Sequence, residues 1–157
     1  MSRETHAFVE RMGGALTQAG LPRLPSLVFS ALLVDDDGRM TSAELAETLA
    51  VSPASVPGAV NYLAQLGMLR RERVRGSRKD VYVVDDDAWH GTLMRRDQLY
   101  APMVAALSAG LRDLGDESPA HQRLLLTREF LTFVDEEMAG LAEKWDQRRA
   151  EIMGIRG

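Results

Sequence analysis

The sequence predicts a mainly α-helical protein with a small β-wing, and three observations lead to this expectation. Two short helical patterns, at residues 42–49 and 53–66, are separated by a tight turn. Two β-like runs follow, at residues 68–74 and 81–84, with a Gly-Ser turn between them. Apolar residues at helical spacing then continue towards the C-terminus. This order predicts a winged helix-turn-helix followed by long C-terminal dimerisation helices.

The composition limits the class of protein. With 157 residues, the chain can form one domain with a hydrophobic core. It has no cysteine, which excludes disulfides and thiolate metal sites. No run of about 18 apolar residues indicates a membrane span, and the first residues lack the apolar region of a signal peptide. The simplest expectation is a cytoplasmic protein that needs no cofactor.

Two helices are expected before the helix-turn-helix. Apolar residues at three- and four-residue spacing predict a helix over residues 3–19, which Gly20 ends. Residues 21–25 contain two prolines and are predicted to form a linker. The next helix is predicted over residues 26–34. A turn of three aspartates and a glycine follows it.

Residues 39–41 are expected to pair with the wing as a short strand, and Thr41 or Ser42 to cap the helix that follows. Pro53 should open the second helix of the unit, because proline suits a first helical turn. Pro57 lies further along and is expected to kink that helix. The face that docks on the preceding helix is predicted to consist of Val56, Val60, Leu63 and Leu66.

Beyond the wing, one long helix is predicted from about residue 88 to 114, with a bend at Pro102, and another from 118 to about 153. Two such helices cannot bury their apolar faces alone, so we expect a symmetric homodimer. The predicted organisation is a winged helix-turn-helix domain at residues 20–87 and a helical dimerisation region formed by residues 1–19 and 88–157.

Charge is unevenly distributed along the chain. The net charge is −4. Residues 20–84 carry eight basic and seven acidic groups, whereas residues 85–157 carry nine basic and fourteen acidic groups. Six of the ten residues from Arg70 to Lys79 are basic. A local patch of this kind can hold phosphates on an acidic protein, so the predicted partner is double-stranded DNA.

These residues resemble the MarR superfamily. The segments ELAETLAVSPASV and YLAQLGMLRR are typical of its winged helix, and the GSR turn with the following YVVDDDAW resembles its GbsR-like branch. The resemblance implies a homodimeric transcriptional regulator, usually a repressor, that binds an inverted-repeat operator. It also implies that the second helix of the unit enters the major groove and the wing the minor groove. Many members release DNA when a small-molecule effector binds between the two domains.

The resemblance places three groups of residues in sites. On the second helix, the DNA-contacting residues would be Ser52, Ser55, Pro57, Gly58, Asn61 and Tyr62. On the wing, they would be Arg73, Arg75, Ser77, Arg78 and Lys79. The third group consists of Trp89, Tyr100, Phe130 and Phe133, which are expected to belong to the core or the dimer seam of the C-terminal helices; the alternative is an effector pocket near them.

Two positions depart from the family pattern. A small polar residue is usual where Pro57 stands, and arginine is common where Asn61 stands, so the second helix has no Arg or Lys. Asn61 can still form a bidentate contact with adenine. Specificity would otherwise depend on DNA shape, sensed by the wing arginines.

Several features have a plainer interpretation. Arg70, at the start of the wing, is as well suited to pair with an acidic residue as to contact DNA. The two aspartate triplets suit turns and helix starts better than a metal site, and the three histidines are too far apart in sequence for a ligand set. No nucleophile–base motif or phosphate loop suggests an enzyme. The alternative to a DNA-binding regulator is a winged-helix module that binds protein.

Overall fold

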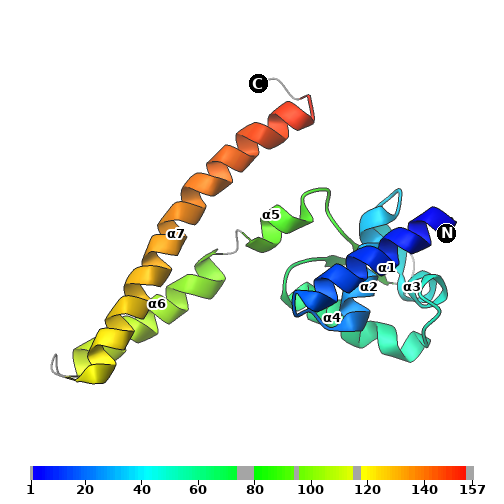
Figure 1. Cartoon of the computed structure of the whole chain (residues 1–157). Coiled ribbons are helices and arrows are strands. Elements are labelled where there is room, and N and C mark those ends of the chain that lie inside the picture. Colours follow the sequence, from blue (N-terminus) through cyan, green and yellow to red (C-terminus); the bar gives the residue numbers. More distant parts are fainter. Residues whose placement is uncertain (1, 74–79, 94–95, 115–117, 155–157) are drawn as a thin grey trace. The chain divides into compact units, whose positions relative to one another are not determined.

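The computed structural model describes residues 2–73, 80–93, 96–114 and 118–154 (Figure 1). Most of them are helical, and a small antiparallel sheet lies in the first part, which confirms the predicted fold class. The chain divides into two compact units, Met1–Thr92 and Leu93–Gly157. The elements are α1 Arg3–Gln18, α2 Arg23–Val34, β1 Arg39–Thr41, α3 Ser42–Thr48, the 3₁₀ turn η1 Pro53–Ser55, α4 Val56–Gln65, β2 Arg70–Arg73, β3 Asp80–Val83, α5 Ala88–Leu93, α6 Arg96–Asp113 and α7 Pro119–Ile152.

Helix α2 forms the centre of the first unit. Eight consecutive residues of this helix, from Pro25 to Leu32, are buried, and α1 packs along it. Burying polar groups is costly unless they are hydrogen-bonded. The buried hydroxyls meet this requirement within the helix, because Ser26 Oγ donates to the Pro22 carbonyl at 2.8 Å and Ser30 Oγ to the Ser26 carbonyl at 2.7 Å.

The predicted linker at residues 21–25 is wrong. Helix α2 begins at Arg23, three residues earlier than expected, with Pro22 as its N-terminal flanking residue. Pro25 then lies in the first helical turn, where a proline removes no hydrogen bond because the first N–H groups have no partner within the helix. The two prolines therefore flank and open the helix instead of forming an extended segment.

The helix-turn-helix begins with the expected cap. Thr41 Oγ1 accepts from the Glu44 backbone N–H, and the Glu44 carboxylate accepts from the Thr41 N–H at 2.7 Å, so the capping box is complete. The turn after α3 passes through Ala50, which adopts a φ of 51°. Gly67 ends α4 with a φ of 70°, which glycine tolerates without strain.

The segment 53–66 is not one helix. It consists of η1 followed by α4, which starts at Val56. Pro57 therefore stands in the first turn of α4, where its missing N–H costs nothing, and the expected kink is wrong. The docking face includes Ala59 in addition to Val56, Val60 and Leu63, whereas Leu66 is 40% exposed and does not belong to it.

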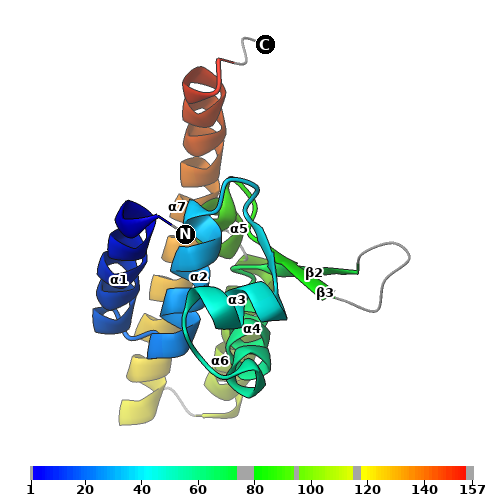
Figure 2. The same cartoon turned by 90° about the vertical axis from the view of Figure 1, so that its right-hand side faces the viewer.

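The sheet has the order β1-β3-β2, and both pairs are antiparallel (Figure 2). The expected pairing of residues 39–41 with the wing is confirmed. Because paired residues share a face of the sheet, Met40, Tyr82 and Arg71 lie in one row on one face. Arg39, Val83 and Arg70 lie in the neighbouring row on the other face.

In the second unit, α6 packs against α7. The predicted final helix is confirmed as α7, whose cap is Ser118. Within the predicted helix over 88–114, the described residues form α5 and α6, and Pro102 lies inside α6. In the described part of the chain, no helix is both long and apolar enough to cross a membrane.

Candidate nucleic-acid interface

The exposed face of α4 is the first part of the candidate interface. Pro57, Gly58 and Asn61 are exposed and lie within one turn of each other, on the side of the helix opposite its buried residues. The helix carries no charged side chain. This face can therefore contact the edges of bases through Asn61 and through backbone groups, but it cannot form ion pairs with phosphates.

Of the three other predicted residues of this region, Ser55 and Tyr62 are engaged within the protein, whereas Ser52 is not. The Ser55 hydroxyl donates to the Ser52 carbonyl at 2.6 Å, so it is engaged within its own turn. Tyr62 is half-buried and packs against the core, so its ring also has a structural role. Ser52 is exposed and forms no side-chain cap.

Gly58 is not required by the packing of the protein. A Cβ atom added there would meet nothing within 4 Å, and the helix backbone at this position does not need glycine. In a helix, glycine costs about 1 kcal/mol relative to alanine. An exposed glycine of this kind is suited to a close approach of the helix backbone by another molecule.

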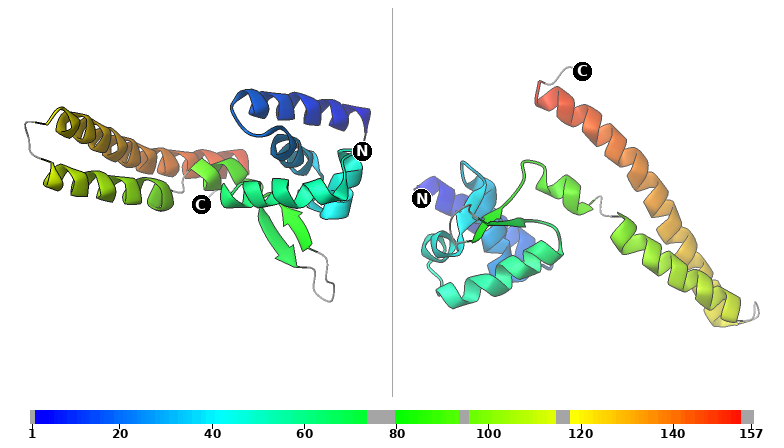
Figure 3. Two further views of the ribbon diagram at one scale, coloured as in Figure 1. Left: turned by 90° about the horizontal axis from the view of Figure 1, so that it is seen from below. Right: turned by 180° about the vertical axis from the view of Figure 1, so that it is seen from behind.

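The wing is the second part of the candidate interface. Its strands β2 and β3 extend away from the helices of the first unit, beside α4 (Figure 3). Arg70, Arg71 and Arg73 lie on β2. Arg70 Nε lies 3.0 Å from Asp85 Oδ1, and its Nη1 pairs with Glu72. Arg70 is thus paired with acidic residues, one of the two roles left open by the sequence. Arg70 and Arg71 have carboxylate partners, whereas no carboxylate of the described residues pairs with Arg73.

Tyr82 holds Arg71 in place at the base of the wing. Arg71 Nη2 donates to the Tyr82 hydroxyl at 3.3 Å, and the guanidinium carbon lies 5.7 Å from the ring centroid. Ser42 Oγ donates to the same hydroxyl at 3.4 Å, which links α3 to the sheet. The hydrogen bond to Tyr82 raises the pKa of Arg71, as does the nearby charge of Asp80. Arg71 is therefore a charged, anchored part of the wing.

The predicted tip residues Arg75, Ser77, Arg78 and Lys79 lie outside the described residues. Their contact with DNA stays a prediction. The structure also reveals participants that the sequence argument missed, namely Arg39 and Glu72, which pair at 2.8 Å at the base of the wing. The sequence did contain one signal for this pairing, because Glu72 is an acidic residue within the otherwise basic run Arg70–Arg73.

Comparison with known proteins identifies the family. A model described as MarR family matches residues 19–80, and one described as MmpR5-like MarR family transcriptional regulator matches residues 87–148. HTH-type transcriptional regulator MmpR5 of Mycobacterium tuberculosis is 31% identical over 145 residues, which cover 92% of this chain and 88% of that protein. The chain belongs to the MarR family.

A crystal structure of a transcriptional regulator supports the same assignment. It is 30% identical to this MarR-family chain, with a TM-score of 0.80, over 92% of this chain and 99% of the other. The likeness extends over nearly the full length of both chains. It therefore includes the C-terminal helices as well as the winged helix.

Three aspartates of the two triplets of this MarR-family protein have structural roles. Asp35 Oδ2 accepts from the Arg39 backbone N–H at 3.1 Å and so stabilises the turn before β1. Asp85 pairs with Arg70, and Asp87 Oδ2 lies 3.4 Å from His90 Nδ1. Within the described ranges, no group of three or more histidine or carboxylate side chains is arranged to hold a metal ion.

The predicted effector residues lie on three helices of the MarR-family chain. Trp89 is on α5, Tyr100 on α6, and Phe130 and Phe133 on α7. Trp89 packs against Phe29, whereas Phe130 and Phe133 are 63% and 58% exposed. A shared pocket for these four residues stays a prediction.

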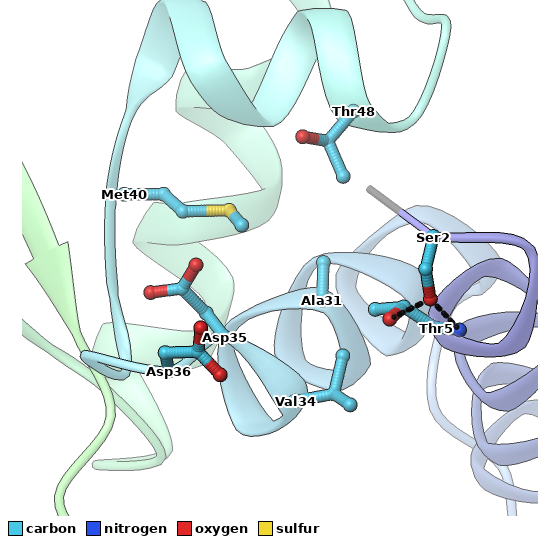
Figure 4. Close-up of a pocket in the computed structure, with 8 residues that line it drawn as sticks. All are labelled: Ser2, Thr5, Ala31, Val34, Asp35, Asp36, Met40 and Thr48. Carbon is cyan, nitrogen blue, oxygen red and sulfur yellow. Dashed lines mark hydrogen bonds between the residues drawn. The ribbon is translucent and has the colours of Figure 1, made fainter.

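A cavity of about 340 Å³ lies elsewhere, within the first unit (Figure 4). The carboxylates of Asp35 and Asp36 are at one side of it, and the bonded hydroxyls of Ser2 and Thr5 are at the other. None of the four predicted effector residues lines it. Its lining consists of Ser2, Thr5, Ala31, Val34, Asp35, Asp36, Met40 and Thr48.

Proposed function

We propose that this MarR-family protein is a homodimeric repressor that binds an inverted-repeat operator, with α4 in the major groove and the wing tip in the neighbouring minor groove. The observation that carries the proposal is the exposed Pro57–Gly58–Asn61 face of α4 beside an arginine-bearing wing. Two-fold symmetry would then place two half-sites about one helical turn apart.

Dimerisation is proposed through the C-terminal helices. Leu126, Phe130, Phe133 and Leu141 on α7 are each at least half exposed in the single chain. Exposed apolar side chains at this density are typical of an interaction surface. In this proposal, residues 20–87 form the DNA-binding domain, and residues 1–19 and 88–157 form the dimerisation region. Burial of Val9 and Leu16 in the core of the first unit gives α1 a structural role there as well.

Regulation by a small-molecule effector is part of the proposal. The aromatic residues Trp89, Tyr100, Phe130 and Phe133 supply the apolar surface that such a ligand needs. Within the MarR family, the resemblance to the GbsR-like branch stays a prediction, and the family model that matches the C-terminal half is described as MmpR5-like.

A protein-binding module remains the second candidate, because α4 carries no positive charge. The test is binding of the purified full-length protein to its own upstream promoter DNA and to a random duplex, at two salt concentrations. Tight, promoter-selective binding is expected. Absence of binding to either duplex at low salt would refute the repressor and favour the protein-binding module.

A further inference from the structure

Glu72 joins two arginines from two different strands at the base of the wing. Its Oε2 atom lies 2.8 Å from Arg39 Nη2, and its Oε1 atom pairs with Arg70 Nη1. Each carboxylate oxygen therefore receives one guanidinium group. Asp85 holds Arg70 from a second direction, through Nε at 3.0 Å.

Stability does not explain this arrangement well. The side chains of Arg39, Arg70 and Glu72 are 49%, 51% and 36% exposed, and ion pairs so open to solvent contribute about 0–1 kcal/mol. The three strands are already joined by backbone pairing. The side chains of Arg39 and Arg70 do lie on either side of the buried Val83 in their row of the sheet, so they can shield it from solvent.

The location of these charges suggests a different role. Arg39 and Arg70 lie at the base of the basic wing, and a guanidinium group that is not paired is a strong ligand for phosphate. Phosphate contacts bind every duplex alike and supply most of non-specific affinity. The pairing of Arg39 with Glu72, and of Arg70 with Glu72 and Asp85, keeps both guanidinium groups from making such contacts.

We propose that Glu72 limits the affinity of the protein for the DNA backbone, because it holds Arg39 and, together with Asp85, Arg70 away from phosphates. This inference rests on the proposed DNA-binding function. It predicts that loss of the Glu72 charge increases affinity for any duplex, which is the opposite of what loss of a purely structural residue would cause.

The size of the effect follows from counterion release. Each additional phosphate contact makes the slope of log K against log salt steeper by about 0.9. Loss of the Glu72 charge releases Arg39, whereas Arg70 keeps its pair with Asp85, so the slope should steepen by about 1. At 0.1 M salt, the same relation gives about eightfold tighter binding for each new contact. The gain should be similar for promoter and random duplexes, because phosphate contacts do not depend on the base sequence.

The experiment compares full-length wild type with Glu72→Gln, which retains the shape of the side chain but removes its charge. Affinity for a random duplex is measured across a salt series, with the unfolding midpoint measured in parallel. The expected result is tighter random-duplex binding, a steeper salt slope and a nearly unchanged midpoint. Adding Arg39→Gln and Arg70→Gln to Glu72→Gln should return the slope to the wild-type value.

Glu10→Gln is the matched control. This variant has the same net charge as Glu72→Gln. It also frees one arginine, because Glu10 pairs with Arg23 at 3.6 Å on the exposed surface of the helices. It should leave the salt slope unchanged. An equal gain in both variants would reduce the effect to net charge and overturn the proposal.

Three other outcomes also overturn it. Unchanged random-duplex affinity in Glu72→Gln, with selective promoter binding by the wild type, rejects the role of Glu72 and leaves the repressor intact. Weaker binding with a lower midpoint shows a structural role instead. If neither protein binds any duplex, the proposed function itself fails together with the inference.

Discussion

Phe29 and Trp89 meet edge to face, with ring centroids 5.6 Å apart and an interplanar angle of 80°. Phe29 is fully buried in α2, whereas Trp89, on the first turn of α5, is 39% exposed. Aromatic pairs in this geometry contribute about 0.5–1.5 kcal/mol beyond the burial of their area. The contact therefore attaches the segment after the wing to the core of the first unit.

Replacing Phe29 with alanine should both destabilise the first unit and alter the surroundings of Trp89. Loss of a buried phenylalanine costs about 3–5 kcal/mol. The chain has two tryptophans, so a Trp145→Phe background makes Trp89 the reporter. We expect a lower urea midpoint and, in the fraction that remains folded, red-shifted Trp89 emission. Native-like emission in a folded Phe29→Ala protein would contradict the contact.

Tyr82→Phe should loosen the base of the wing without unfolding the protein. The substitution removes the acceptor shared by Arg71 and Ser42 but keeps the buried ring. A hydrogen bond of this kind contributes about 0.5–1.5 kcal/mol, so a stability loss of that order is expected in urea unfolding. Ser42→Ala should cost less, because it leaves the Arg71 contact in place. An equal loss in both variants would indicate that Arg71 adds nothing.

Two neighbouring glycines of α1 should respond differently to alanine. A Cβ atom at Gly13 would lie 2.6 Å from Leu27 Cδ2, whereas one at Gly14 would meet nothing within 4 Å. Alanine gains about 1 kcal/mol over glycine in a helix, but overpacking costs about 1–3 kcal/mol. Gly14→Ala should therefore be stabilised in thermal unfolding, and Gly13→Ala should be the less stable of the two. The reverse order would show that α1 and α2 do not pack this closely.

The sequence was informative where structure depends on local chemistry. Thr41 with Glu44 predicts a capped helix, and Gly67 a helix end, because both signals act within a few residues. The role of Pro57 could not be settled in the same way. Whether a proline kinks a helix or opens it depends on where the helix starts, and here a 3₁₀ turn moves that start to Val56.

The ion pairs of the wing depend on strand register. Arg39 and Glu72 are 33 positions apart and come together only through the order β1-β3-β2. Periodicity shows which face of a strand a residue occupies but not which residue lies beside it across the sheet. The contact of Trp89 with Phe29 was missed for the same reason, since Trp89 could equally have joined the seam of the C-terminal helices.

Asn61→Ala and Arg78→Ala should separate base recognition from phosphate binding. Asn61 is exposed on α4, and losing a bidentate base contact should cost about 1–3 kcal/mol at one base pair and relax the preference there. Arg78→Ala should weaken binding to all sequences and reduce the salt slope by about 1. Binding-site selection and salt titration measure the two effects. An unaltered sequence preference in Asn61→Ala would remove this residue from the recognition surface.

Gly58→Ala should stabilise the protein and weaken its binding to DNA. Nothing in the structure lies within 4 Å of the added methyl group, so the helix should gain about 1 kcal/mol. If DNA approaches the α4 backbone closely at this exposed position, the methyl group would occupy the space that a base or phosphate needs. Gly14→Ala, on α1, has an equally open environment and should be stabilised without loss of DNA affinity. Thermal unfolding and promoter binding measured on both variants decide the matter. Equal DNA affinity in Gly58→Ala and wild type would show that the glycine does not face DNA, because a gain in stability alone is expected from any solvent-facing glycine of a helix.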